Sequence, residues 1–173
     1  MRIYRERITA IAKDIVAALQ KAELIEVEPE MVEEVELDIE SVLKEYRRTD
    51  YQLTENARDL VSQRGLDYSH TFKLKAQLAS KQRFGLGEDG IEWIIQQMLE
   101  ILLQSKNLEE IFGEDHEIRR AISPILKKEL SVNSKLDIEV KRRIKNMQEG
   151  TSGYDVEYQK TMEKLRQSRG MDE

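Results

Sequence analysis

Residues 8–19 read ITAIAKDIVAAL and residues 91–102 read IEWIIQQMLEIL, so apolar side chains fall at matching positions of the two stretches. The second stretch follows the first at an offset of 83 positions (91 − 8). The same offset relates later apolar residues without a gap: Val35, Ile39, Val42, Leu43, Leu53, Ala57 and Val61 match Ile118, Ile122, Ile125, Leu126, Leu136, Val140 and Ile144. A fixed internal period is typical of a duplicated structural unit. The sequence therefore predicts one unit present twice.

Within each copy the apolar residues recur at spacings of three and four, which is typical of amphipathic helices. In the first copy they predict helices over about residues 3–22, 29–46, 53–64 and 68–83. Asp50 or Thr54 is a candidate cap for the third of these helices, and Gly65 suits its C-terminal end. In the second copy Pro124 is expected to kink the second helix or to begin a new one after Ser123.

The composition favours an all-α protein. Of the 173 residues only 8 are Gly and 2 are Pro, which leaves little turn chemistry for an all-β fold. Two copies of one unit usually pack as a homodimer would. We therefore expect a duplicated four-helix unit, its two copies packed about a pseudo-two-fold axis. The expected boundaries are a first helical repeat at 1–84, a Gly-rich joint at 85–90 and a second repeat at 91–173.

Charge and cysteine content restrict the class of protein. The net charge is −6, which argues against a dedicated nucleic-acid binder, and no cysteine is present to form disulfides or thiolate metal sites. The N-terminus lacks the apolar core of a signal peptide, and no segment has the roughly 18 apolar residues of a membrane span. We expect a cytoplasmic protein with no membrane association.

No arrangement of residues suggests catalysis, a metal or a cofactor. The two histidines, His70 and His116, lie at non-equivalent positions of the copies, and neither has a His or Cys three or four positions further along. Gly85, Gly87 and Gly90 spell a dinucleotide-binding pattern, but the β-strand that this motif requires before it is missing. The sequence predicts a protein that is not an enzyme.

Acidic residues are concentrated between positions 23 and 40, where nine Asp or Glu occur without a Lys or Arg. Within this run Glu33, Glu34, Glu36 and Glu40 are the candidate acidic docking surface. Charge runs of this kind most often only face water. The functional alternative is a surface that binds a basic partner.

Basic residues gather in the second repeat at Lys141, Arg142, Arg143 and Lys145. Such side chains could contact phosphates of a nucleic acid. Alternatively, they pair with the acidic region of the other copy or face water. The four residues are the candidate phosphate-binding or partner-binding group.

Several stretches carry a family resemblance: RERI at residues 5–8, VKRRIK at 140–145, EGTS at 149–152 and YDVEYQK at 154–160. They resemble the bacterial family known as domain of unknown function 507, in its double-length form. The resemblance implies a small, charged, helical bacterial protein. It implies no enzymatic activity, cofactor or catalytic residue.

Together these features favour a non-enzymatic helical interaction protein, an adaptor or assembly factor with an unidentified protein partner. The alternative hypothesis is an RNA- or ribosome-associated protein that uses the basic helix of the second repeat. That alternative predicts steeply salt-dependent binding.

Overall fold

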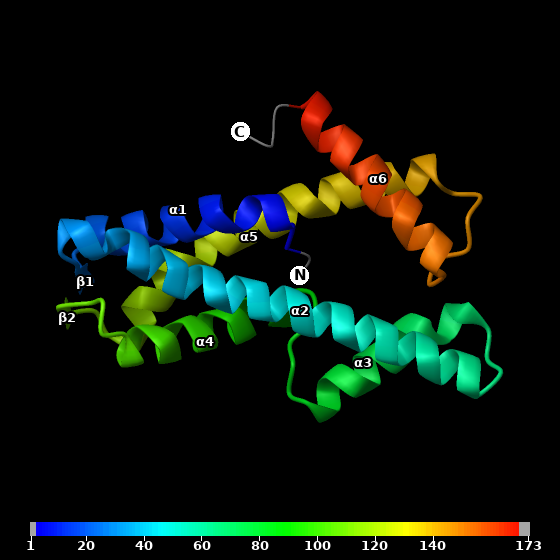
Figure 1. The fold of residues 1–173 in the computed structure, drawn as a ribbon, viewed down its shortest axis with the longest axis horizontal. Helices are drawn as coiled ribbons and strands as arrows, with labels where there is room; N and C mark the ends of the chain where they lie inside the picture. Colours follow the sequence, from blue (N-terminus) through cyan, green and yellow to red (C-terminus); the bar gives the residue numbers. More distant parts are fainter. Residues whose placement is uncertain (1–2, 170–173) are drawn as a thin grey trace. The chain divides into compact units, whose positions relative to one another are not determined.

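The computed structural model describes residues 3–169 of the chain. Helices make up most of this range (Figure 1), which confirms the prediction of an all-α protein. The α-helices are α1 (Ile8–Lys21), α2 (Val32–Gln63), α3 (Thr71–Lys81), α4 (Asp89–Gln104), α5 (Asp115–Arg143) and α6 (Ser152–Ser168). Short 3₁₀ turns η1 (Arg5–Arg7), η2 (Pro29–Met31) and η3 (Tyr68–His70) precede α1, α2 and α3, and strands β1 (Ile25–Glu26) and β2 (Glu110–Ile111) pair antiparallel. None of the described helices is both long and apolar enough to cross a membrane.

The chain divides into two compact units. Unit 1 comprises residues 1–48 and 87–130, and unit 2 comprises residues 49–86 and 131–173. Each unit takes part of each predicted repeat, because α2 and α5 both begin in unit 1 and end in unit 2. The boundaries at 84 and 91 describe repetition along the sequence and stay a prediction.

Unit 1 contains α1, α4 and the first parts of α2 and α5. In Figure 1, α1 runs beside the first part of α2. The hairpin of α4 and α5 is joined by Arg119, which donates to Glu92 and Gln96 at 2.9 and 2.7 Å. Each fully buried Ile or Leu stabilises the fold by roughly 1.5–3 kcal/mol. The core of unit 1 includes Ile11, Ile15, Leu19, Ile39, Leu43, Tyr46, Ile94, Ile95, Met98, Leu102, Ile122 and Leu126.

Unit 2 contains α3, α6 and the second parts of α2 and α5. In Figure 1, α3 folds back along α2, and Ala57, Val61 and Leu74 form a small apolar core there. The α6 helix packs on α5, where the Tyr158 hydroxyl donates to Asp137 at 2.5 Å. Arg58 of α2 donates to the Gly150 carbonyl at 3.0 Å and thereby ties the loop before α6 to α2.

The predicted break between the second and third helices is wrong, since α2 is continuous from Val32 to Gln63. The expected caps have other roles. The Thr54 hydroxyl donates to the Asp50 carbonyl at 3.0 Å within the helix, and the Asp50 carboxylate pairs with Lys75 at 2.7 Å. Residues 47–52 contain neither Gly nor Pro, so nothing in them stops a helix.

The alternative in which a new helix begins after Ser123 is also wrong, because α5 runs from Asp115 to Arg143 with Pro124 inside it, whereas the kink at Pro124 stays a prediction. Ile122 and Leu126 on either side of the proline are fully buried. Packing of this apolar stripe therefore outweighs the cost of a proline within a helix.

The predicted helix end at Gly65 is confirmed. Gly65 has φ +61°, and the Leu66 N–H donates to the Val61 carbonyl at 3.0 Å, which closes the end of α2. The predicted joint at 85–90 is shorter in the structure, since Asp89 and Gly90 belong to the first turn of α4 and Gly90 is buried.

Candidate acidic docking surface

Two loops of unit 1 meet through the β1–β2 ladder. Ile25 pairs with Ile111 and Glu26 with Glu110. The Phe112 N–H donates to the Leu24 carbonyl at 2.9 Å, which extends the contact beyond the strands. The backbone thus holds the loop after α1 against the loop before α5.

Close packing behind the ladder depends on a glycine. A Cβ added at Gly113 would lie 2.8 Å from Leu24 Cδ2 and 3.2 Å from Ile118 Cγ1. Leu24 and Ile118 are both buried. A side chain at this position would require Leu24 and Ile118 to shift, so the glycine favours close packing of the two loops on an apolar base.

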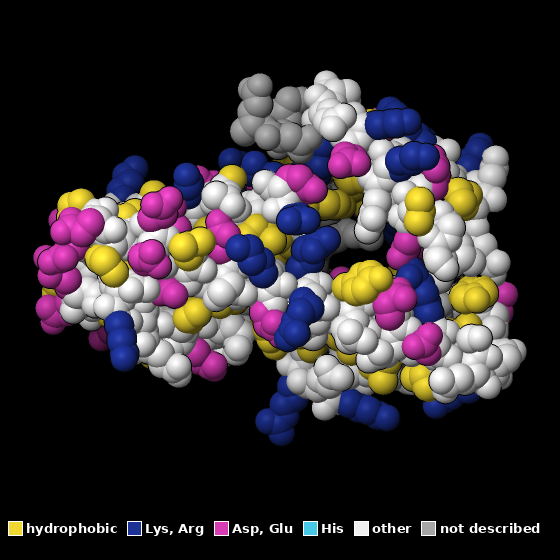
Figure 2. Space-filling view, in the orientation of Figure 1, with side chains coloured by type: hydrophobic (Ala, Val, Ile, Leu, Met, Phe, Trp, Pro, Cys, Tyr) yellow, Lys and Arg dark blue, Asp and Glu magenta, His cyan; other side chains and the backbone are white. Residues whose placement is uncertain are grey.

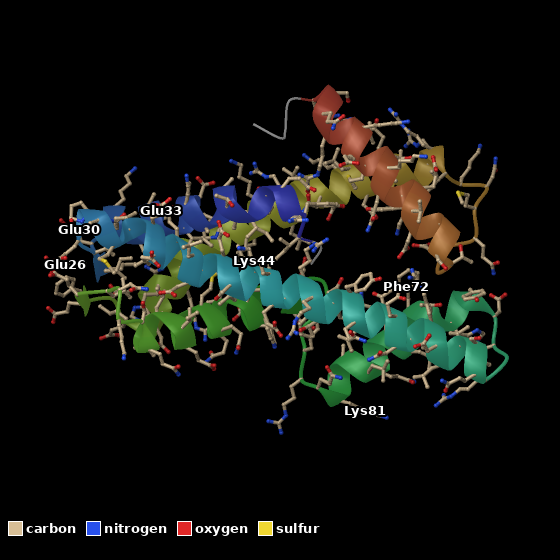
Figure 3. All side chains as sticks on the ribbon, in the orientation of Figure 1. Glu26, Glu30, Glu33, Lys44, Phe72 and Lys81 are labelled. Carbon is tan, nitrogen blue, oxygen red and sulfur yellow. The ribbon has the colours of Figure 1, made fainter. Side chains whose placement is uncertain are left out.

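The two segments that this ladder joins, 23–36 and 109–117, carry twelve carboxylates and contain no Lys or Arg. We call this group the acidic end. Its members are Glu23, Glu26, Glu28, Glu30, Glu33, Glu34, Glu36, Glu109, Glu110, Glu114, Asp115 and Glu117. All are exposed except Glu36 on α2, which is half-buried. Figure 2 shows acidic side chains gathered there, and Figure 3 labels Glu26, Glu30 and Glu33 among them.

The acidic side chains of the two loops are close enough to repel one another. Glu28 raises the pKa of the Glu109 carboxyl through a shared hydrogen bond and its charge, and Glu26 and Glu30 add to the effect. A raised pKa means that the ionised form is disfavoured in the folded chain. The fold therefore holds these charges together against their repulsion.

The predicted acidic residues are divided by the structure. Glu33 and Glu34 are exposed at the start of α2 and belong to the acidic end, together with Glu36. Glu40 is only 7% exposed and accepts a hydrogen bond from Lys44 at 2.6 Å. Bonds from Lys44 and Thr9 lower the pKa of the Glu40 carboxyl despite its burial. Glu40 therefore belongs to the packing of α2 on α1 rather than to an open surface.

Five carboxylates of the acidic end, at positions 109–117, are absent from the sequence-based prediction. Their segment lies 83 positions after residues 26–34, so the internal repeat could have predicted that this segment is also acidic. The repeated acidity becomes a single surface only because the ladder joins the two loops.

The predicted basic residues lie at the end of α5 and in the turn that follows, within unit 2. Lys141 pairs with Asp137 at 3.3 Å and with Glu149 at 3.1 Å, and Arg143 pairs with Glu139 at 2.9 Å. Burial lowers the pKa of Lys141, but Glu149 and Asp137 together raise it above its usual value. Arg142 and Lys145 are exposed and have no ion pair with any residue of the 3–169 range. Two of the four cations are therefore already neutralised within unit 2.

Each histidine ring lies beside an oxygen atom from its own stretch of the chain. His70 lies beside the Asp67 carbonyl at 3.1 Å, and His116 lies 3.3 Å from Glu114. Among the described residues no group of three or more His, Asp or Glu is arranged to hold a metal ion. The acidic end accordingly lacks the convergent geometry of a cation site within this range.

The two units differ in charge. Unit 1 has 13 Lys or Arg against 22 Asp or Glu, a net charge of −9, whereas unit 2 has 15 against 12, a net charge of +3. The two repeats each contribute to both units, so their sequences conceal this difference. Unit 1 is therefore strongly acidic, whereas unit 2 is weakly basic.

The family profile described as Protein of unknown function (DUF507) matches residues 1–171, essentially the whole chain. The chain belongs to this family. No curated protein sequence matches it.

Proposed function

We propose that this member of the DUF507 family is a non-enzymatic adaptor or assembly factor whose acidic end binds a basic segment of a protein partner. The observation that carries the proposal is that one backbone ladder joins two segments, 23–36 and 109–117, which together carry twelve carboxylates and no Lys or Arg. Like charges placed opposite one another in a sheet destabilise it. A binding role gives a reason for this arrangement, because a cationic partner removes the repulsion.

An exposed aromatic side chain adds to this surface. Phe112, directly after β2, is 57% exposed and is flanked by Glu110 and Glu114 in the sequence. Aromatic residues are enriched at the centres of protein interfaces. A basic segment that also presents an apolar side chain fits this combination of charges and ring.

The proposal includes a duplicated architecture with a pseudo-two-fold relation between the copies. At the 83-residue offset, positions 110 and 111 correspond to 27 and 28. The pairs 26–110 and 25–111 then become 26–27 and 25–28 in the numbering of one copy. The centre of these pairs lies between positions 26 and 27, directly beside the paired residues themselves, as expected for a two-fold axis that passes through the ladder. This agreement supports the duplication, and a bacterial, cytoplasmic setting remains part of the proposal.

The proposal is tested by affinity purification from the source cells with three forms of the protein. The acidic-end variant carries Glu26→Gln, Glu30→Gln, Glu33→Gln and Glu109→Gln. The control carries Glu6→Gln, Asp14→Asn, Glu88→Gln and Asp89→Asn, which change the charge equally at exposed positions of unit 1 outside the acidic end. We expect one protein to co-purify with the wild type and the control but not with the acidic-end variant. Equal recovery with all three forms would contradict the proposal.

A second candidate function is association with RNA or the ribosome through the basic end of α5. The net charge of +3 on unit 2 and the exposed Arg142 and Lys145 favour it. Nuclease treatment of half of each purification separates the two candidates. Loss of the captured material after treatment, together with dependence on Arg142 and Lys145, would favour this function over the first.

A further inference from the structure

We propose that the groove between α2 and α4 of unit 1 is the docking site for a basic amphipathic helix of the partner. The inference rests on the proposed function, because it names the second contact made by the protein bound at the acidic end. The groove has a volume of about 260 Å³ and is open to solvent. Its lining residues are Ser41, Val42, Glu45, Trp93, Gln97, Glu100, Ile101 and Gln104.

The base of the groove is apolar and well supported. Trp93 packs against the fully buried Tyr46, with ring centroids 5.6 Å apart. Trp93 and Ile101 remain half-exposed, and Val42, which also lines the groove, is 7% exposed. A partly exposed tryptophan on a rigid base is typical of an interface hot spot.

The rim of the groove is acidic. Glu45 of α2 and Glu100 of α4 both line it and are exposed. Glu45 pairs with Arg48 at 2.8 Å, whereas Glu100 accepts hydrogen bonds from the neutral Gln96 and Gln97. An apolar base between carboxylates complements a helix with one apolar stripe flanked by Lys or Arg.

Helix α2 and the segment after α4 link the groove to the acidic end. Asp38 accepts hydrogen bonds from Ser105 at 2.6 Å and from Asn107 at 3.0 Å, at the point where the chain leaves α4 for β2. On α2, Glu34, Leu37 and Ser41 follow helical spacing from the acidic end to the groove, and Leu37 is 48% exposed. One partner segment can therefore reach both surfaces.

Corresponding positions on α1 and α5 have a different character. At the 83-residue offset, Trp93, Glu100, Ile101 and Glu45 correspond to Ala10, Ala17, Ala18 and Lys128. The aromatic ring and the carboxylates are therefore not a requirement of the repeated helix packing. They distinguish the α2–α4 face from its counterpart.

The length of the groove sets the size of the occupant. From Trp93 to Gln104 the α4 axis rises about 16 Å, at 1.5 Å per residue. A partner helix of about three turns covers this distance, with apolar residues at spacings of three and four.

The test uses Trp93, the single tryptophan of the chain, as a fluorescent reporter. The probes are three 15-residue helical peptides without aromatic residues, each with a leucine stripe flanked by Lys, Ser or Glu. A fourth peptide has the Lys-flanked composition in scrambled order. We expect the Lys-flanked helix to shift Trp93 emission to shorter wavelength and to bind at least about tenfold more tightly than the Glu-flanked helix.

Three substitutions to arginine locate the binding site, each adding one positive charge. Ser41→Arg and Ile101→Arg place a cation in the groove, whereas Leu103→Arg alters a residue of α4 that is 68% exposed and does not line it. We expect Ser41→Arg and Ile101→Arg to weaken binding about tenfold, and Leu103→Arg to change it less than about twofold. Circular dichroism and thermal melting establish that each variant is folded.

Each other outcome is decisive. Binding of the Lys-flanked and scrambled peptides with no change in Trp93 emission would overturn the groove and leave the proposed function standing. Binding of neither peptide would contradict both. The emission of Trp93 could also shift to shorter wavelength as the protein concentration rises, with no peptide added. That result would show that a second copy of the chain occupies the groove, and would overturn the inference.

Discussion

Glu26 and Glu110 lie directly opposite each other in the β1–β2 ladder, although they are 84 positions apart in the sequence (110 − 26). Like charges at opposed positions of an antiparallel pair are unfavourable. The ladder nevertheless forms, because Leu24 and Ile25 are buried beneath it and Gly113 allows close packing. The acidic end is thus a consequence of the apolar base that lies below it.

Replacement of Glu109 by Gln should raise the melting temperature slightly at pH 7. Glu28, Glu26 and Glu30 raise the pKa of Glu109, so the folded chain binds this proton more readily than the unfolded chain. The folded state is therefore favoured at acidic pH and loses stability as the pH rises through the raised pKa. Thermal melts from about pH 3.5 to about pH 8 should show a gain at neutral pH that disappears at the acidic limit.

Asp14→Asn is the control for this substitution, because Asp14 is exposed on α1 away from the segments of the acidic end. The gain from Glu109→Gln should also decrease in about 0.5 M NaCl, at which the Debye length is about 4 Å. A gain that is independent of pH and salt would show that repulsion is not its cause.

Replacement of Gly150 by Ala should destabilise unit 2 by about 2 kcal/mol or more. Gly150 has φ +94°, and an added Cβ would lie 2.7 Å from the Tyr68 carbonyl oxygen, which belongs to the backbone. Gly65→Ala is a matched control, since Gly65 has φ +61° and a Cβ added there would meet nothing within 4 Å. Gly65→Ala should lower the free energy of unfolding by about 1 kcal/mol, because of its left-handed backbone conformation alone. Equal losses of unfolding free energy in urea would contradict the proposed contact.

Replacement of Arg58 by Met should lower the free energy of unfolding by about 3 kcal/mol. The Arg58 side chain is 12% exposed and bonds to Glu55, Asp155 and the Gly150 carbonyl. Burial lowers the pKa of Arg58, but the two carboxylates raise it overall, so the side chain is a fixed cation. Its removal leaves Asp155 without this partner.

Arg48→Met is the comparison for this loss, because the Arg48 side chain is 77% exposed in its pair with Glu45. An exposed pair contributes less than about 1 kcal/mol. Hydrogen exchange should also show faster opening of residues 148–155 in Arg58→Met alone. Unchanged exchange in this loop would contradict the anchoring role of Arg58.

Replacement of Pro124 by Ala should stabilise the chain by about 1–3 kcal/mol. Pro124 is exposed within α5 and supplies no N–H to the helix. Alanine restores the missing donor while Ile122 and Leu126 keep their buried positions. A loss of stability in urea denaturation would show that the proline is needed for the shape of α5.

The apolar spacing in the sequence predicts where the helices lie, and Gly65 marks the end of α2 correctly. The helix starts predicted at Asp50 and Pro124 are wrong. A cap residue or a proline ends a helix only where tertiary packing does not stabilise the helix on both sides of it. Leu43 and Leu53 lie on either side of the expected break, and both are buried. Their packing stabilises α2 as one continuous helix. Local signals are too weak to decide such cases.

The candidate surface was predicted only in part. Glu33 and Glu34 lie on it, but the contribution of residues 109–117 depends on a strand pairing between distant segments, which periodicity does not reveal. Glu40 has the same chemistry as its neighbours and differs only in burial against α1. The groove beside Trp93 likewise arises from the packing of α2 on α4, which single-helix patterns do not specify.

The most direct test of the central claim is photo-crosslinking in the source cells from two positions. One protein carries a photoreactive residue in place of Glu30 at the acidic end, and the other carries it in place of Lys145 in the turn after α5; both positions are exposed. We predict one discrete protein adduct from position 30 and none from position 145. RNA or ribosomal adducts from position 145, with none from position 30, would contradict the account.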